Sequence, residues 1–400
     1  MYNQVIFHID VNSAFLSWSA LRLLEEGSDT DLRLIPSIVG GDQETRHGIV
    51  VAKSIPAKSY GIQTADTVAS ALRKCPNLVM VSPDHAYYRE KSRQLMKYLA
   101  AICPKIEQVS VDECYMDFEP IRDRFESPEA AAIFIKDSVY KTFGFTVNVG
   151  VSDRKVLAKM ASDFKKPNLV HTLYAREIQK KLWPLPVSDL HMCGKSSADL
   201  LRKMGIRTIG DLAKTDLATV ESWLKSHGRL LWNYANGIDS STVVSEPVRA
   251  KGIGNSTTLA RNAETREEAC KVLKLLAESV AGRLKKQHFL AGQISTEIKY
   301  ASFRSVSHQT TLLTPTSDAK EICRKACSLF DELWNGDPIR LLGIRTTKLE
   351  DEGEPVQMNL FDFQKNQEAQ RKQRKLDDAM DAICKKYGEG AIRRGVSDNQ

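Results

Sequence analysis

Three carboxylates stand where apolar segments of the sequence end or meet. Asp10 closes an apolar segment that starts at Gln4, and Asp112 and Glu113 are adjacent between two further apolar segments. If these segments are neighbouring strands, the three acids converge, and like charges a few ångströms apart raise each other's pKa. A divalent cation relieves the repulsion, and two Mg²⁺ ions about 4 Å apart suit phosphoryl or nucleotidyl transfer. Taken singly, an aspartate at a strand end is more often a turn former.

Two lysines could supply positive charge to such a site. Lys166 ends a helical segment directly before Pro167, and a proline favours an extended turn that can direct the lysine toward a phosphate. Lys58 lies on a second, short basic helix. Either lysine alone could equally be a helix cap or a solvated charge. Together with the acids, they indicate a triphosphate site.

The elements that must position these residues follow from hydrophobic periodicity and turn signals. The order of strands and helices up to residue 151 indicates an α+β or α/β layer, and the helical stretches after it lead into a separate all-helical region that ends near residue 236. The predicted strands are 4–10, 37–41, 47–53, 106–111, 114–118 and 146–151, and the predicted helices are 12–24, 57–60, 86–103, 127–143, 156–164 and 175–182.

Beyond a polar linker, the last hundred residues before the tail form a basic domain. Residues 249–348 contain 17 Lys and Arg against 10 Asp and Glu, a net charge of +7 that equals the charge of the whole chain. Such a domain favours binding to a polyanion, most commonly nucleic acid. Two β-α-β halves in series indicate a small ferredoxin-like sheet; the strands are 254–259, 293–300, 307–313 and 339–348, and the helices are 266–287 and 317–334.

The composition excludes several classes of protein. With 42% hydrophobic and 27% charged residues, the chain is neither collagen-like nor wholly disordered. No apolar run approaches the roughly 18 residues that cross a bilayer, and the first residues do not resemble a signal peptide. The eight cysteines are scattered, which predicts reduced thiols. We therefore expect a cytoplasmic protein that does not bind membranes.

Five segments resemble, in order and spacing, the successive motifs of Y-family DNA polymerases. The resemblance is strongest to the bacterial DNA polymerase IV branch and covers about residues 1–363. Any one motif is weak, but the ordered set is very specific. The segments are Phe7–Phe15, Val51–Gly61, Ser110–Tyr115, Gly150–Lys159 and Ser162–Asn168.

The resemblance implies roles for individual residues. Asp10, Asp112 and Glu113 fall on the acids that bind two Mg²⁺ ions, and Val11 falls on the position that offers a backbone carbonyl to one ion. Phe15 falls on the steric gate, a bulky ring that excludes the 2′-OH of a ribonucleotide. The residues that fall on triphosphate-binding positions are Lys58 and Lys166.

The sequence departs from the family pattern at two places. Tyrosine and arginine are usual where this chain has Ile55 and Lys58, so a hydroxyl is missing and a bidentate fork is replaced by a point charge; Ser54 could complete the site. In the helix-hairpin-helix that the family uses to contact DNA, Met192 replaces the first hairpin glycine. Gly194 and Lys195 remain as expected DNA contacts.

The implied fold is an α+β multidomain right hand. The expected domains are a palm at 1–13 and 84–173, fingers at 14–83, a helix-hairpin-helix thumb at 174–240, a linker at 241–248, a ferredoxin-like little finger at 249–348 and a flexible tail at 349–400. Expected DNA contacts in the little finger are Lys251, Arg304, Arg340 and Arg345. In the tail, the peptide Gln357–Phe361, with Leu360, resembles a sliding-clamp-binding motif; the alternative is that it folds back on the protein.

The expected activity is template-directed, low-fidelity DNA synthesis across damaged template. The expected partners are primer-template DNA, dNTP and the sliding clamp, and we expect a monomer. Two other classes compete: a DNA-binding, clamp-tethering protein without activity on the same fold, and a nucleotide cyclase with a related palm. The intact Asp10, Asp112 and Glu113 oppose the first, and the helical region and basic domain oppose the second.

Overall fold

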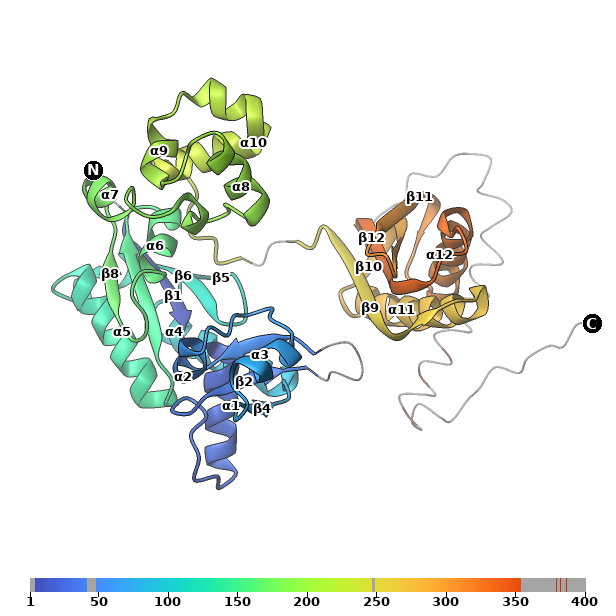
Figure 1. Cartoon of the computed structure of the whole chain (residues 1–400), viewed down its shortest axis with the longest axis horizontal. Helices are drawn as coiled ribbons and strands as arrows, with labels where there is room; N and C mark the ends of the chain where they lie inside the picture. The colour runs from blue at the N-terminus through green and yellow to red at the C-terminus, as the bar shows by residue number, and fades with distance from the viewer. Residues whose placement is uncertain are drawn as a thin grey trace, which may run out of the picture. The chain divides into compact units, whose positions relative to one another are not determined.

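The chain divides into two compact units. The computed structural model describes residues 4–41, 48–246 and 249–353, together with 379, 382 and 386. The units are residues 1–249 and 250–400, and Figure 1 shows their elements in chain order.

The first unit is built on a five-stranded sheet in the order β5-β6-β1-β7-β8. Neighbouring strands are antiparallel except β7 and β8, which are parallel. The strands are β1 (Ile6–Val11), β5 (Ile106–Gln108), β6 (Glu113–Asp117), β7 (Val147–Ser152) and β8 (Val170–Thr172), and the helices that accompany them are α4 (His85–Ile102), α5 (Pro128–Phe143) and α6 (Lys155–Ser162), with a 3-10 turn η1 (Glu119–Arg124).

Side chains of β1 alternate between two differently covered faces of this sheet. Phe7, Ile9 and Val11 belong to the apolar core made with α4 and α5. His8 points to the other face, where its ring contacts Ser162 of α6. Because residues two apart in a strand share a face, Asp10 lies on the α6 side with His8.

A glycine lets α6 approach this sheet closely. Gly150 of β7 pairs with His8 of β1, and a Cβ at Gly150 would lie 1.9 Å from the carbonyl oxygen of Ala158 in α6. No side chain fits there. The close approach brings the side chains of α6 to the end of β1.

A small three-stranded sheet forms a lobe of the first unit. Its order is β3-β2-β4, and Leu16 and Ala20 of α1 pack against Val39 of β2. The elements are α1 (Ala14–Glu25), β2 (Ser37–Gly40), β3 (Val50–Lys53), α2 (Ile55–Ser59), α3 (Val68–Lys74) and β4 (Val79–Val81).

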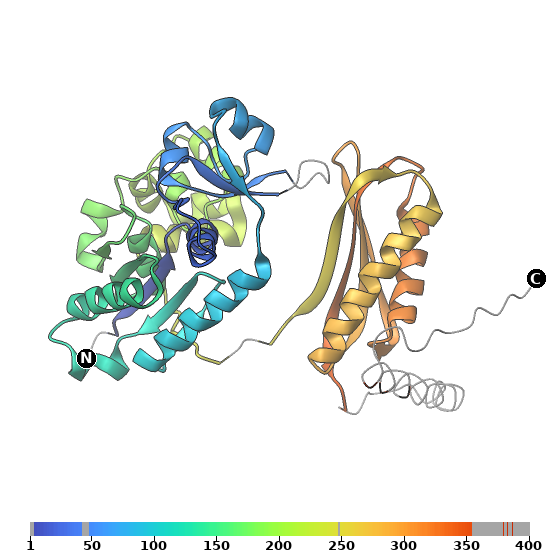
Figure 2. The same ribbon diagram turned by 90° about the horizontal axis from the view of Figure 1, so that it is seen from below.

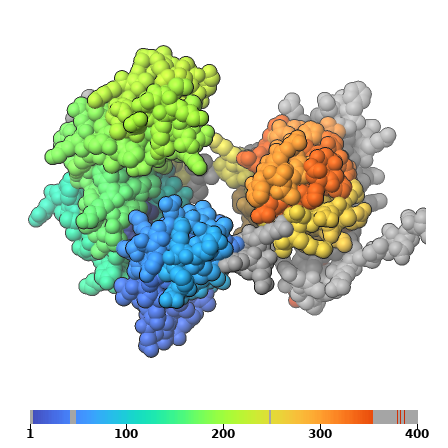
Figure 3. Space-filling view, in the orientation of Figure 1, coloured from blue at the N-terminus to red at the C-terminus, as the bar shows by residue number. Residues whose placement is uncertain are grey.

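A helical region completes the first unit, and its apolar core includes Val156, Leu157 and Met160 of α6. It lies at the opposite end of the unit from the three-stranded sheet, and the space-filling view shows the two as separate lobes (Figure 3). Its elements are η2 (Ala175–Glu177), α7 (Ile178–Lys181), η3 (Val187–Asp189), α8 (Lys195–Lys203), α9 (Ile209–Lys214) and α10 (Leu217–Ala235).

The second unit is a four-stranded antiparallel sheet with two helices. The strand order is β11-β10-β12-β9. The two strands of each predicted β-α-β half are therefore separated by one strand of the other half: β12 lies between β9 and β10, and β10 lies between β11 and β12. Both helices lie on one face (Figure 2). The elements are β9 (Gly252–Ala263), α11 (Arg266–Lys286), β10 (Phe289–Tyr300), β11 (Ser305–Thr316), α12 (Ala319–Leu333) and β12 (Ile339–Asp351).

The structure differs from the sequence predictions at short elements. The strand predicted over 106–111 ends at Gln108, because Val109 and Ser110 turn and both donate to the Glu113 carbonyl. Strands β4 and β8, of three residues each, were not predicted. The seven cysteines in the described part of the chain are free thiols, and no helix there is long and apolar enough to span a bilayer.

We predict that Gly150→Ala destabilises the first unit by about 3 kcal/mol, because the new methyl group must push α6 away from the sheet. Urea unfolding measures the change. Gly194→Ala is the control, since a Cβ there meets no atom within 4 Å. Equal stabilities of the two variants would contradict the close approach of α6.

Candidate functional site

The predicted acids are brought together at the ends of β1 and β6. Asp10 and Glu113 are direct cross-strand partners, and the Val11 N–H donates to the Asp112 carbonyl at 3.0 Å. The Asp112 carboxylate accepts from the Ser110 hydroxyl at 2.5 Å. As the side chains stand, no group of three His, Cys, Asp or Glu in the described residues is arranged to hold one ion, so sharing a cation requires side-chain rotation.

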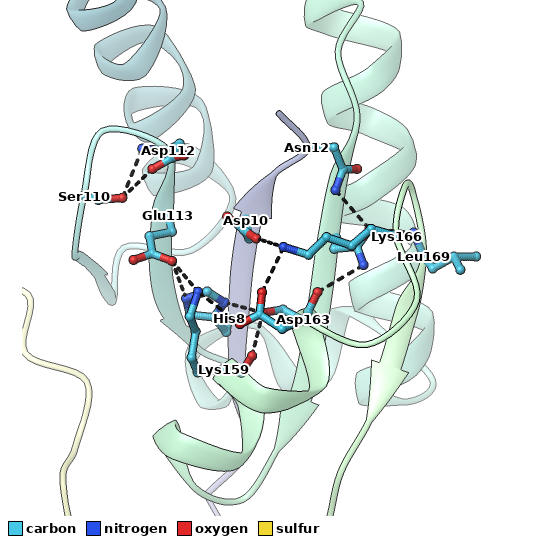
Figure 4. Close-up of polar contacts among 12 residues, drawn as sticks. His8, Asp10, Asn12, Ser110, Asp112, Glu113, Lys159, Asp163, Lys166 and Leu169 are labelled. Carbon is cyan, nitrogen blue, oxygen red and sulfur yellow. Dashed lines mark hydrogen bonds and ion pairs between the residues drawn. The ribbon is translucent and has the colours of Figure 1, made fainter. Parts of the chain in front are cut away.

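Lys159 and His8 surround the Glu113 carboxylate. Lys159 Nζ lies 2.6 Å from Glu113 Oε2, and His8 Nε2 lies 3.4 Å from the same oxygen. The other ring nitrogen of His8 is 2.8 Å from the Ser162 hydroxyl, which donates to the Lys159 carbonyl. Figure 4 shows how α6 delivers Lys159 to this carboxylate.

Lys166 contacts the Asp10 carboxylate from the loop after α6. Its ammonium forms an ion pair with Asp10 and another, at 2.9 Å, with Asp163 (Figure 4). The loop is held by Asn148, whose amide donates to the Ser162 and Lys165 carbonyls at 3.1 and 3.0 Å. The lysine predicted to bind triphosphate therefore contacts a predicted metal-binding acid.

The three carboxylates have different electrostatic surroundings. Burial, and then the charges of Asp10 and Glu113, raise the pKa of Asp112 despite its bond from Ser110. The pKa of Glu113 is lowered to about 2 by the neighbouring His8 imidazole and by the Lys159 ammonium. Burial lowers the pKa of His8, so its ring is neutral at pH 7. A nearby cation would lower the pKa of Asp112 by stabilising its ionised form.

The predicted gate residue is held by aromatic packing. The half-buried Phe15 ring stacks on Tyr88, with centroids 4.6 Å apart and planes at 11°, and meets His85 edge-on at 6.1 Å. The Tyr88 hydroxyl lies 2.6 Å from the Ser19 hydroxyl. The orientation of Phe15 is therefore fixed by α1 and α4 together.

The structure opposes the suggested role of Ser54. Its buried hydroxyl accepts from Ala57 N and Ser37 N at 3.0 and 3.1 Å and donates to the Ile35 carbonyl at 2.7 Å. One donor and two acceptor positions are all that a hydroxyl has. Ser54 is the N-cap of α2, and binding a phosphate would break this arrangement.

Lys58 has a second cation beside it. Both Lys58 and Ile55 are exposed on α2. Lys53, at the end of β3, donates to Thr64 at 3.2 Å, and its pKa is lowered by burial and then by the charge of Lys58. The two ammonium groups are thus close enough to repel each other.

The hairpin before α8 keeps the conformation that a glycine would adopt. Met192 has a φ of 68° in the left-handed region and is half exposed. The Cys193 N–H donates to the Leu190 carbonyl at 2.9 Å, and Gly194 is the N-cap of α8, whose first residue is Lys195. The departure at Met192 changes the side chain and leaves the turn intact.

The four expected DNA contacts of the second unit do not form one cluster. Lys251 precedes β9, and Arg345 lies in the middle of β12, where it pairs with Gly254 and Ser295. Arg304 and Arg340 lie at the other end, near the β10–β11 turn. The expected clamp-binding peptide, with Gln357, Leu360 and Phe361, lies outside the described residues.

Sequence reasoning missed three residues of the site, His8, Lys159 and Tyr88. The sequence does indicate that His8 lies near the site, because residues 8 and 10 of one strand share a face. Lys159 and Ser162 are three apart on a helix and so share its face. Nothing in the sequence indicated the stacking of Tyr88 on Phe15.

Two family models match the chain. The impB/mucB/samB family matches residues 9–163, and its C-terminal domain matches residues 250–360. DNA polymerase IV of Clostridium acetobutylicum is 43% identical over 98% of both chains, and DNA polymerase IV 1 of Bacillus subtilis is 37% identical over 99% of this chain and 93% of its own. A solved chimeric Y-family DNA polymerase, 20% identical, aligns with a TM-score of 0.75 over 89% of this chain and all of its own.

The fold and the acids at the end of its central strand define a polymerase of the right-hand type, with a helix-hairpin-helix region and a terminal sheet domain. The chain belongs to the impB/mucB/samB family, which is the Y-family of DNA polymerases, and is most similar to its DNA polymerase IV branch.

We predict that Glu113→Gln lowers the free energy of unfolding by about 2 kcal/mol at pH 7 in EDTA. A carboxylate whose folded pKa is about 2, against 4.5 in the unfolded chain, stabilises the fold above pH 4.5 and loses this effect as the pH falls toward 2. Urea unfolding from pH 7 to pH 3 should show the difference shrinking.

Glu119→Gln is the control for this titration, because Glu119 forms an ion pair with Arg122 at the surface. Such a pair contributes at most about 1 kcal/mol. A Glu113→Gln deficit that is constant with pH would contradict the assignment.

Proposed function

We propose that this chain extends a DNA primer by two-metal nucleotidyl transfer, with Asp10, Asp112, Glu113 and the Val11 carbonyl holding two Mg²⁺ ions. Members of the family are metal-dependent nucleotidyltransferases. The supporting observation is the electrostatics of Asp112: it is a carboxylate beside two others, its pKa is raised, and it accepts a hydrogen bond from the Ser110 hydroxyl. Carboxylate oxygens are ligands that Mg²⁺ prefers.

In the proposed reaction, the primer 3′-OH attacks the α-phosphate of a dNTP and pyrophosphate leaves. When bound, the two ions stabilise the attacking and leaving oxygens. Asp10 and Glu113 approach from neighbouring strands, so the sheet fixes their separation. The Lys159 ammonium, 2.6 Å from the Glu113 carboxylate, keeps Glu113 ionised, the form that would bind a metal ion.

Lys166 links metal binding to triphosphate binding in this proposal. Its ammonium pairs with Asp10 in the structure. If Asp10 bound a metal ion, the Lys166 ammonium would lose this partner and could pair with the triphosphate instead. Lys58, with Lys53 beside it, adds charge from the three-stranded lobe and partly replaces the arginine fork.

Phe15 acts as the steric gate in the proposed site. Its ring cannot swing away from a ribose 2′-OH without leaving its stack on Tyr88. The contact between the Tyr88 and Ser19 hydroxyls holds the Tyr88 ring in this stack. The gate is thus a property of two packed helices.

The domain roles are part of the same proposal. We assign residues 1–13 and 84–173 as palm, 14–83 as fingers, 174–240 as thumb, 241–248 as linker, 249–348 as little finger and 349–400 as tail. The proposed biology is low-fidelity translesion synthesis in the bacterial cytoplasm by a monomer, tethered to the sliding clamp through Gln357–Phe361. It draws on the homologous DNA polymerase IV chains. The three intact acids oppose the non-catalytic tethering alternative.

Primer extension with Mg²⁺ and dNTPs tests the metal site. Asp112→Asn should lower the extension rate by about 100-fold or more, because it removes a charged ligand. It should still fold and melt no lower than wild type in EDTA, because it removes a repelled charge. Mg²⁺ with dNTP should raise the Tm of wild type more than that of the variant. Normal extension by Asp112→Asn would overturn the assignment.

Ribonucleotide incorporation tests the gate. Phe15→Ala should extend a primer with rNTPs at least about 10-fold faster than wild type does, since no ring blocks the 2′-OH. Phe15→Tyr is the matched control, because it keeps the ring and should still exclude rNTPs. Equal exclusion of rNTPs by the alanine variant would argue against Phe15 as the gate.

A further inference from the structure

A phenylalanine lies exposed at the tip of a hairpin in the second unit. Phe303 is in the turn between β10 and β11, has 62% of its surface exposed and adopts a left-handed φ of 65°. Asparagine and glycine are the usual residues in this conformation. An exposed ring and a left-handed backbone both oppose folding, so neither stability nor turn formation accounts for a phenylalanine at this position.

Two cations flank this ring. Lys299 Nζ lies 5.3 Å and the Arg340 guanidinium carbon 4.8 Å from the centroid of Phe303. Both distances are within the range of cation–π attraction. The tip of the hairpin therefore combines an aromatic surface with two positive charges.

A β-bulge directs Arg340 toward the tip. Along β12, Leu341 pairs with Lys299 and Ile339 pairs with Tyr300, so Arg340 is the extra residue between them. The ladder with β9 shifts at the same place. Bulges redirect side chains in this way.

The base of the turn is firmly attached to the domain. Tyr300 is buried and its hydroxyl donates to the Leu333 carbonyl at 2.9 Å. The Ala301 N–H donates to the Pro338 carbonyl at 2.8 Å, and Tyr300 N–H donates to the Arg304 carbonyl at 2.9 Å. The ring of Phe303 is thus presented from a rigid support.

An unpaired nucleobase satisfies both parts of this arrangement. A base presents a flat π surface that stacks on an aromatic ring, and its phosphates are anions that attract lysine and arginine. In a duplex the bases are already stacked on each other and do not offer their faces. A free phosphate or an acidic peptide would use the cations and leave the ring exposed.

We propose that Phe303 is a stacking platform for an unpaired base of single-stranded DNA, with Lys299 and Arg340 contacting the adjacent phosphates. The proposal rests on the proposed function, in which the substrate is a primer-template with a single-stranded segment. It adds a binding site for that segment within the second unit.

Fluorescence anisotropy with the full chain tests the proposal on three labelled DNAs: a blunt duplex, the same duplex with a thymidine 5′ overhang, and the duplex with an overhang of abasic residues. Thymidine and abasic overhangs have the same phosphates, so their difference measures the contribution of the bases. We expect wild type to bind the thymidine overhang at least about 5-fold tighter than the abasic one.

Phe303→Ala should lose this preference, and Phe303→Trp should keep it. Phe303→Ala should leave the salt dependence of binding unchanged, because it removes no charge. Arg340→Ala should reduce the slope of log K against log salt concentration by about one. Leu313→Ala is the matched control, because Leu313 is an apolar residue on β11 that is 89% exposed and has no role in the proposal. Thermal melting verifies that each variant is folded.

The outcomes separate this proposal from the polymerase assignment. A preference for thymidine that survives in Phe303→Ala, or that is lost equally in Leu313→Ala, overturns the platform and leaves the polymerase function standing. Wild type that binds all three DNAs alike overturns it too. Wild type that binds none of them contradicts both proposals.

Discussion

The repulsion among three carboxylates at the end of β1 is the constraint on which the site depends. Pairing of β1 with β6 places Asp10 opposite Glu113 and leaves Asp112 at the adjoining turn. Such a cluster is stable only with positive charge nearby. Two lysines supply it for Asp10 and Glu113, and Asp112 keeps a raised pKa. Two of the acids are therefore neutralised within the fold, and Asp112 is the one whose charge the proposed metal ions would stabilise.

That constraint connects the site to the packing of the sheet. Lys159 reaches Glu113 only because α6 lies against Gly150 without an intervening side chain. The residues of β1 that alternate with His8 and Asp10 fill the core with α4 and α5. Phe15, the predicted gate residue on α1, is attached to the same core through its stack on Tyr88 of α4. Packing and chemistry therefore use opposite faces of one strand.

The elements that could be predicted from the sequence are those with a long, regular hydrophobic pattern. The first strand, the long helices and the element order of the two β-α-β halves match the sequence predictions to within a few residues at their ends. A three-residue strand such as β8 shows too little alternation to detect. Side-chain contacts are harder to predict than strands and helices, because they join residues far apart in the sequence. The hydrogen bond between His8 and Ser162, for example, joins residues 154 apart. The N-cap role of Ser54 does have a sequence signal, because Ser54 stands two residues before Pro56 at the start of a helix. The hydroxyl of an N-cap serine bonds to the helix backbone.

The charges of the second unit suit the proposed binding of DNA without reading its sequence. Alternate residues of β12 face the two helices: Leu342, Ile344 and Thr346 are buried, whereas Arg345 is exposed. Positive charge lies at both ends of the sheet instead of in one patch. Charges spread over a surface neutralise phosphates at several points, which gives affinity that falls steeply with salt and depends little on base identity. A single aromatic ring adds stacking, which accepts any base, so damaged template need not be excluded by the domain that holds it.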